Sequence, residues 1–146
     1  MKSFLITFKP ATENPELGWP IEKLQTLVKR HLAGERVEEK WRFYNQKDVS
    51  HGDRVFLLLQ GKSGPAIIGY GKVSGEPEAE KKGRQMIQFE AVVDPTTQVL
   101  ASREDLLAID GSEGVWSTQR SGIKLEEPIA TQLEALVIGS SPRHQS

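Results

Sequence analysis

The spacing of hydrophobic side chains divides the chain into strand-like and helix-like segments. Phe4, Ile6 and Phe8 occupy every second position of the first segment, which predicts a strand with one buried face. The same alternation predicts a strand over residues 87–93. Residues 37–44 have the pattern of a half-buried strand. The nearly continuous apolar run over residues 54–60 and the run over residues 66–73 predict two paired strands joined by a turn at 61–65.

Helical spacing appears in two longer segments and one short one. Trp19-Pro20 opens a helix whose apolar positions extend to Leu32, with Gly34 as its C-cap. A capping box at residues 102–105 predicts a short helix through residue 109. A short strand around residues 123–125 precedes a last helix over residues 126–137.

This order of elements predicts an α+β protein with a small, largely antiparallel curved sheet or barrel flanked by helices. Gly69 and Gly71 lie inside one predicted strand, which indicates a bend or a close approach of two backbones. We expect residues 1–139 to form a single domain, with a charged loop over residues 75–83. Residues 140–146 are expected to form a flexible C-terminal tail.

Composition narrows the classes of function. The chain has 146 residues, no cysteine and three histidines, which argues against disulfides, zinc ribbons, iron–sulfur clusters and thiol nucleophiles. A net charge of −1 argues against strong, indiscriminate binding to nucleic acid but leaves room for a local patch. No apolar run approaches the roughly 20 residues of a membrane span, so we expect a cytoplasmic protein without a membrane partner.

Motifs for catalysis are weak. Gly61-Lys62-Ser63 resembles the end of a phosphate-binding loop, but the required earlier glycine is replaced by Phe56. No nucleophile and base can be paired from the sequence, and the carboxylates have the pattern of solvated faces, caps or turns. We therefore expect no enzymatic activity, no cofactor and no metal site.

The three tryptophans admit two interpretations. Trp19, Trp41 and Trp116 each lie beside a loop or an element end, with polar or basic neighbours. Tryptophan is usually well buried, so any of them could belong to the core. Alternatively, flat indole faces could stack on a nucleobase while nearby amide and hydroxyl groups read its edge.

Two blocks of sequence resemble the EVE branch of the PUA-like superfamily. The first is a tryptophan, Trp41, some ten residues ahead of Gly-Asp-Arg-Val-Phe-Leu-Leu-Leu-Gln-Gly (52–61), followed by Ile-Ile-Gly-Tyr-Gly-Lys-Val (67–73). The second is Trp-Ser-Thr-Gln-Arg-Ser-Gly-Ile (116–123) ahead of the last helix. This second block resembles the closing segment of EVE-like domains found in modification-dependent restriction proteins, often joined to HNH nucleases. The resemblance spans nearly the whole chain.

The resemblance implies a PUA-like small curved β-barrel flanked by helices, and a domain that binds without catalysis. Such domains, like the related YTH readers, accept a flipped and often modified base in an aromatic pocket. Flipping costs a few kcal/mol of unstacking, which a tryptophan-lined pocket can offset. We therefore expect a reader of DNA that carries a modified base, and we expect that base to be a modified cytosine. The sequence contains no HNH motif, so a nuclease would be a partner chain or a fused domain.

Expected roles follow from the matched positions and from side-chain chemistry. Trp41 and Trp116 stack on the base, and Ser117 and Gln119 read its edge. Trp19 is assigned to the same pocket by its chemistry alone. The expected phosphate contacts are Lys9, Arg42, Arg120 and Lys124. Two alternatives remain open: an RNA-binding PUA-like module, and a regulatory domain that binds a protein or a small ligand.

Overall fold

A single curled sheet organises the computed structural model, which describes residues 1–9, 21–44, 48–61, 64–75, 84–118 and 120–138. The order of its six strands is β2-β5-β4-β3-β1-β6. The strands are β1 (Ser3–Phe8), β2 (Val37–Arg42), β3 (Arg54–Leu59), β4 (Ala66–Val73), β5 (Arg84–Val92) and β6 (Ile123–Lys124). The helices are α1 (Ile21–Leu32), α2 (Arg103–Leu107), the 3₁₀ turn η4 (Val115–Ser117) and α3 (Glu127–Val137).

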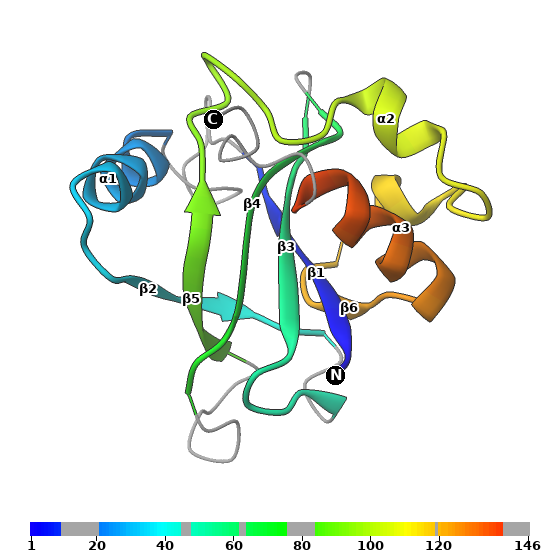
Figure 1. The fold of residues 1–146 in the computed structure, drawn as a ribbon, viewed down its shortest axis with the longest axis horizontal. Coiled ribbons are helices and arrows are strands. Elements are labelled where there is room, and N and C mark those ends of the chain that lie inside the picture. The colour runs from blue at the N-terminus through cyan, green and yellow to red at the C-terminus, as the bar shows by residue number, and fades with distance from the viewer. Residues whose placement is uncertain (10–20, 45–47, 62–63, 76–83, 119, 139–146) are drawn as a thin grey trace.

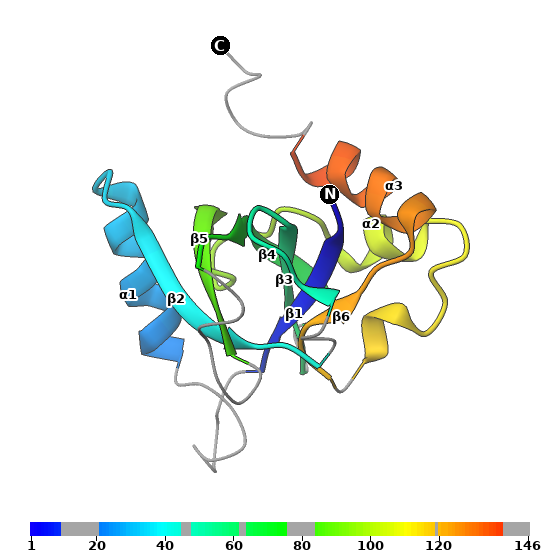
Figure 2. The same cartoon turned by 90° about the horizontal axis from the view of Figure 1, so that it is seen from below.

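The helices lie on both sides of the sheet. Figures 1 and 2 place α1 on one side and α2 and α3 on the other. Alternate residues of each central strand therefore enter two different cores. On β1, Phe4, Ile6 and Phe8 pack in the cluster that α1 covers, which we call the inner core, whereas Leu5 joins the outer core with α2, η4 and α3. The predicted α+β class, with a curved sheet flanked by helices, is confirmed.

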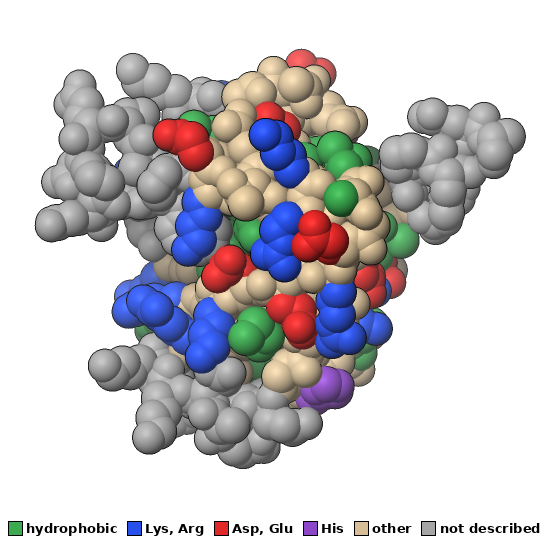
Figure 3. Space-filling model, turned by 90° about the vertical axis from the view of Figure 1, so that its left-hand side faces the viewer, with side chains coloured by type: hydrophobic (Ala, Val, Ile, Leu, Met, Phe, Trp, Pro, Cys, Tyr) green, Lys and Arg blue, Asp and Glu red, His purple; other side chains and the backbone are tan. Residues whose placement is uncertain are grey.

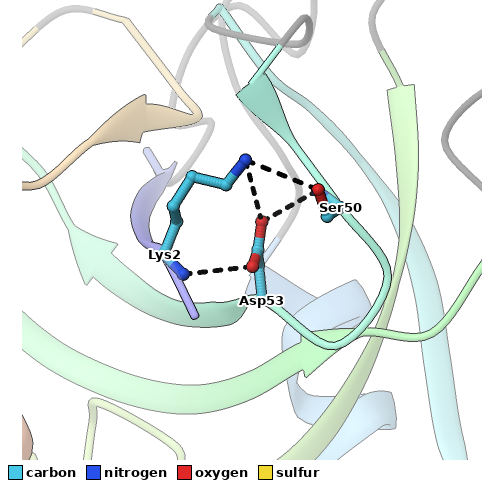
Figure 4. A network of polar contacts seen from close by, with 3 residues as sticks. All are labelled: Lys2, Ser50 and Asp53. Carbon is cyan, nitrogen blue, oxygen red and sulfur yellow. Dashed lines mark hydrogen bonds and ion pairs between the residues drawn. The ribbon is translucent and has the colours of Figure 1, made fainter.

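Pairing is antiparallel throughout the named strands, except that β1 and β3 run parallel. A buried carboxylate joins the starts of these two strands. Asp53, 4% exposed, accepts hydrogen bonds from the backbone N–H groups of Lys2 (3.1 Å) and Ser50 (2.8 Å), and the Lys2 Nζ lies 3.9 Å from it (Figure 4). This contact fixes the parallel register, so the opposite ends of β1 and β3 also lie side by side.

Glycine allows two backbones of the curled sheet to approach closely, as the sequence predicted. The β4–β5 register shifts between Tyr70 and Gly71, and any side chain at Gly71 would overlap the carbonyl of Gln88. The capping box is present as well: Ser102 Oγ accepts from the Asp105 N–H at 3.2 Å, and the Asp105 carboxylate accepts from the Ser102 N–H at 3.0 Å. The helix that it starts is shorter than predicted and ends at Leu107.

Three other expectations have a different outcome. The strand predicted over residues 37–44 ends at Arg42, because the chain there leaves β5 and turns toward β1. The expected opening of the first helix at 19–20, most of the charged loop and the tail at 140–146 lie outside the described residues. Among the helices in the described ranges, none has the length and apolar character that crossing a membrane would require.

Candidate functional site

A surface hollow of about 280 Å³ lies where β1 and β3 end. Three segments distant in sequence build it: the residue after β1, the connection between β3 and β4, and the turn η4. Its lining consists of Lys9, Gln60, Gly61, Gly64, Pro65, Trp116 and Ser117. The hollow therefore brings together three residues that the sequence assigned to the site: Lys9, Trp116 and Ser117.

Trp116 is held rigidly at the wall of this hollow. Gly114, with φ of 83°, turns the chain into η4, and the indole then enters the outer core, where the residue is 5% exposed. Its Nε1 donates to the carbonyl of Leu106 at 3.1 Å and to Ser112 Oγ at 3.0 Å. Because the indole N–H is satisfied within the protein and the residue is almost wholly buried, Trp116 offers the hollow a small, fixed surface and no donor.

Gln60 forms another side of the hollow. Its backbone N–H donates to the carbonyl of Phe8 at 2.9 Å, which ties the end of β3 to the end of β1. Its side-chain Nε2 donates to the carbonyl of Thr118. At Gly64 a side chain would overlap the carbonyl of Leu59, so backbone forms this part of the lining.

The chain from Thr118 onward leads from the hollow to an exposed aromatic residue that the sequence assignment missed. Arg120 places its guanidinium carbon 4.3 Å from the ring centroid of Tyr44, a cation–π contact. Tyr44 is 56% exposed. In the sequence, Tyr44 resembled one more residue of a half-buried strand, and its partner lies 76 positions along the chain. Only the fold brings the two together.

Trp41 occupies a different environment. It is 5% exposed in the inner core, where its ring meets that of Phe89 edge to face with centroids 5.9 Å apart. Its Nε1 donates to the carbonyl of Thr7 at 2.9 Å. The Thr7 N–H in turn donates to Ser121 Oγ at 3.0 Å. Trp41 therefore closes the gap between β2 and β1 from inside the sheet.

The two indoles do not face one another across one pocket. Trp41 on β2 belongs to the inner core and Trp116 on η4 to the outer core, and these two cores lie on opposite faces of the sheet. A cage built from both rings is therefore not the arrangement in this structure. Contact between a base and either ring stays a prediction. Trp19 and Gln119 lie outside the described residues.

The four predicted phosphate contacts are spread over the molecule. Lys9 lines the hollow, and Arg120 lies on the segment that leaves it. Arg42 is exposed and follows Trp41 on β2. Lys124 pairs with Phe4 in register, about 17 Å from Lys9 at roughly 3.3 Å per strand residue. It lines a separate groove beside the N-terminus of α3. The structure thus separates Lys124 from the hollow.

The surface beside α1 and β2 carries charges of both signs. On the side that carries α1 and β2, Lys and Arg side chains are interspersed with Asp and Glu (Figure 3). Arg30 pairs with Glu35 at 3.3 Å, and Arg36 pairs with Glu38 at 3.2 Å. Hydrogen bonds from Ser74 and Arg36 lower the pKa of Glu38. This face therefore offers paired charges in place of a continuous basic surface.

Among the described residues, the lining of the hollow offers an ammonium group, an amide, a hydroxyl, a proline ring, backbone and the exposed part of Trp116. None of its lining residues in the described ranges is Asp, Glu, His or Cys. Likewise, no group of three or more such residues suited to a metal ion occurs within the described parts of the chain. The lining suits hydrogen bonding, stacking and attraction of an anion.

Comparison with known proteins relates this chain to others through its structure. No protein-family model and no curated protein sequence matches the chain. Among solved structures, human THYN1 in complex with DNA containing 5-methylcytosine superposes with a TM-score of 0.57 at 14% identity, over 93% of this chain and 97% of THYN1. A protein of Leishmania major gives a TM-score of 0.60 at 14% identity, over 100% and 98% of the two chains.

The Mmi1 YTH domain superposes with a TM-score of 0.52 at 12% identity, over 95% of this chain and 77% of that domain. At identities of 12–14%, these similarities show the fold alone. The restriction-associated subgroup expected from the sequence stays a prediction. The protein has the α+β fold of PUA-like domains.

Proposed function

We propose that this protein is a non-catalytic reader domain that binds nucleic acid, specifically DNA carrying a modified base, and that the hollow at the end of β1 receives that base. The observation that carries the proposal is the convergence of Lys9, Gln60, Trp116 and Ser117 on one hollow. The similarity in fold to human THYN1, whose structure was solved with DNA containing 5-methylcytosine, supports it.

The size and chemistry of the hollow suit one flipped base. Its volume of about 280 Å³ falls just below the roughly 300–1,000 Å³ of pockets for drug-sized ligands. Trp116 supplies apolar surface for the ring or an added methyl group, and Ser117 and Gln60 supply polar groups at its edge. Lys9 carries the charge that attracts the adjoining phosphates. Binding is modest and sensitive to salt, because the net charge of −1 provides no long-range attraction.

A role in recognition alone fits the same lining. Among the described lining residues Lys9 is the one titratable side chain, and no carboxylate or imidazole accompanies it as a general acid or base. The domain would then report a modified cytosine to another component. In keeping with the resemblance to restriction-associated domains, that component is a nuclease, as a partner chain or a fused domain.

Fluorescence anisotropy with labelled oligonucleotides tests this proposal. Duplexes that contain one cytosine, 5-methylcytosine or 5-hydroxymethylcytosine at the same position are titrated with the protein at several salt concentrations. We expect the modified duplexes to bind at least several-fold more tightly than the plain one. Equal and undetectable binding to all three would refute the proposal. Tighter binding of unlabelled single-stranded RNA in competition would assign the hollow to RNA.

A pair of variants locates the site. Ser117→Phe places a ring at the hollow, whereas Thr131→Phe places the same ring at an exposed position on α3. We expect Ser117→Phe to abolish the preference for the modified duplex, and Thr131→Phe to leave it unchanged. If the two variants bind the modified duplex with equal affinity, the binding site lies elsewhere on the molecule.

A further inference from the structure

The stacked pair Tyr44–Arg120 is unusual for its exposure. Tyr44 is 56% exposed. Among the large apolar side chains that are exposed in the described residues, it is the one aromatic. Arg120 is also exposed, and its guanidinium lies over the ring at 4.3 Å. Among the described residues, none of the ion pairs to Asp or Glu involves Arg120. Ring and guanidinium thus form an exposed, cationic aromatic surface.

Hydrogen bonds fix both residues by their backbones. The Tyr44 N–H donates to the carbonyl of Ser121 at 2.7 Å. The Arg120 N–H donates to Thr118 Oγ1 at 3.1 Å, and that hydroxyl donates to the Arg120 carbonyl at 3.2 Å. Gly122 lies so close to Phe43 that any side chain there would overlap it. The backbones of both residues are therefore held before any ligand arrives, which reduces the entropy lost on binding.

The pair lies close to the hollow along the chain. Ser117 lines the hollow and Arg120 follows three residues later, so at most about 11 Å of extended chain separates them. Successive nucleotides of one strand are about 3.4 Å apart along a stacked helix. A strand whose base occupies the hollow therefore brings its adjoining nucleotides within reach of the pair.

We infer that Tyr44 and Arg120 form a second nucleotide subsite, which stacks on an unpaired base next to the one in the hollow. This inference rests on the proposed function. Aromatic rings and planar guanidinium groups stack on any base, so the subsite adds affinity without reading sequence. A neighbour still paired within a duplex cannot offer its face to the ring. The protein therefore favours a modified base whose flanking nucleotide is unpaired.

A coupling experiment tests the subsite. Short single strands carry 5-methylcytosine with an ordinary base on both sides, or with an abasic residue on one side or the other. For the wild-type protein we expect loss of the stacked neighbour to weaken binding about 5- to 100-fold, the range for one base on an aromatic ring. The abasic residue on the opposite side has little effect. Tyr44→Ala weakens binding of the intact strand by a similar factor and is then insensitive to the abasic change.

Conservative variants separate stacking from folding and from charge. Tyr44→Phe retains the ring and binds like the wild type, whereas Arg120→Lys retains the charge but loses affinity for the intact strand. Thermal unfolding of Tyr44→Ala confirms that the variant is folded. The inference is overturned if the wild-type protein binds the strand but the two changes act independently. The loss of affinity from Tyr44→Ala and the abasic residue together would then equal the product of the two separate losses. If the wild type binds the modified duplex but no modified single strand, the inference is overturned and the proposed function stands. If it binds neither, both fail.

Discussion

The indole Nε1 of Trp41 donates a hydrogen bond to the backbone carbonyl of Thr7, 2.9 Å away, and thereby joins β2 to the end of β1. These two strands are not neighbours in the hydrogen-bonded order of the sheet. A side chain supplies the bond that an adjacent strand would otherwise make. Trp41 thus contributes to closure of the curled sheet beside the candidate site.

Trp41→Phe should therefore reduce stability more than affinity. Phenylalanine keeps an aromatic ring near Phe89 but leaves the carbonyl of half-buried Thr7 without its donor, which costs about 1 kcal/mol. Urea denaturation should show that loss, while the Kd for a 5-methylcytosine duplex changes less than about threefold. A stable variant with strongly reduced affinity would instead support the stacking role expected from the sequence.

Gly122 provides a second test of how the curled sheet closes. It has φ of 79°, and a side chain there would overlap Phe43. Gly34 has a similar φ of 84° but open space around it. Gly34→Ala should cost about 1 kcal/mol, the strain of the left-handed conformation alone, whereas Gly122→Ala should cost clearly more. Denaturant midpoints of the two variants provide the comparison, and equal losses would show that the Phe43 contact relaxes without cost.

How far the sequence predicts this structure depends on the range of the interactions. The two-residue period of β1 and the capping box at Ser102 are local signals, and both elements form. The resemblance to EVE-like domains led to the PUA-like fold. By contrast, the placement of Trp41 and Trp116 in separate cores depends on which sheet face each residue enters. The contact between Tyr44 and Arg120 likewise depends on closure of the sheet, which no local pattern encodes.

Gln85 provides a stability prediction of the opposite sign. It is 2% exposed and lies across from Trp41 on β5, and its Oε1 has no hydrogen-bond partner among the residues that the structure describes. A buried acceptor without a donor costs about 1–3 kcal/mol. Gln85→Met has a similar shape and removes the polar atoms, so the free energy of unfolding should rise by about 1 kcal/mol. A decrease in that free energy on urea denaturation would show that the amide contributes to stability.

Acid should weaken the contact between α1 and the turn after β5. Hydrogen bonds from the Thr96 side chain and backbone, and from Gln25, lower the pKa of Asp94 below its ordinary value. The folded state therefore favours the carboxylate. Its contribution is complete above the unfolded-state pKa of about 4 and disappears as the pH falls through the lower folded-state pKa. Asp94→Asn should reduce stability at pH 7 and show a shallower decline in acid than the wild type.

Lys9 and Lys124 form a matched pair for locating the nucleic-acid surface. Both are exposed lysines that flank or belong to the β1–β6 edge, but Lys9 lines the hollow and Lys124 lies about 17 Å away at the other end of β1. Lys9→Glu and Lys124→Glu change the net charge equally, so any long-range electrostatic effect is shared. We expect Lys9→Glu to weaken binding of a modified duplex at least tenfold at low salt and to make log Kd less dependent on log salt. Lys124→Glu should cause only the smaller loss of affinity that comes from the change in net charge. Equal losses would indicate that the strand extends along the whole of β1, as the four-residue phosphate contact expected from the sequence requires.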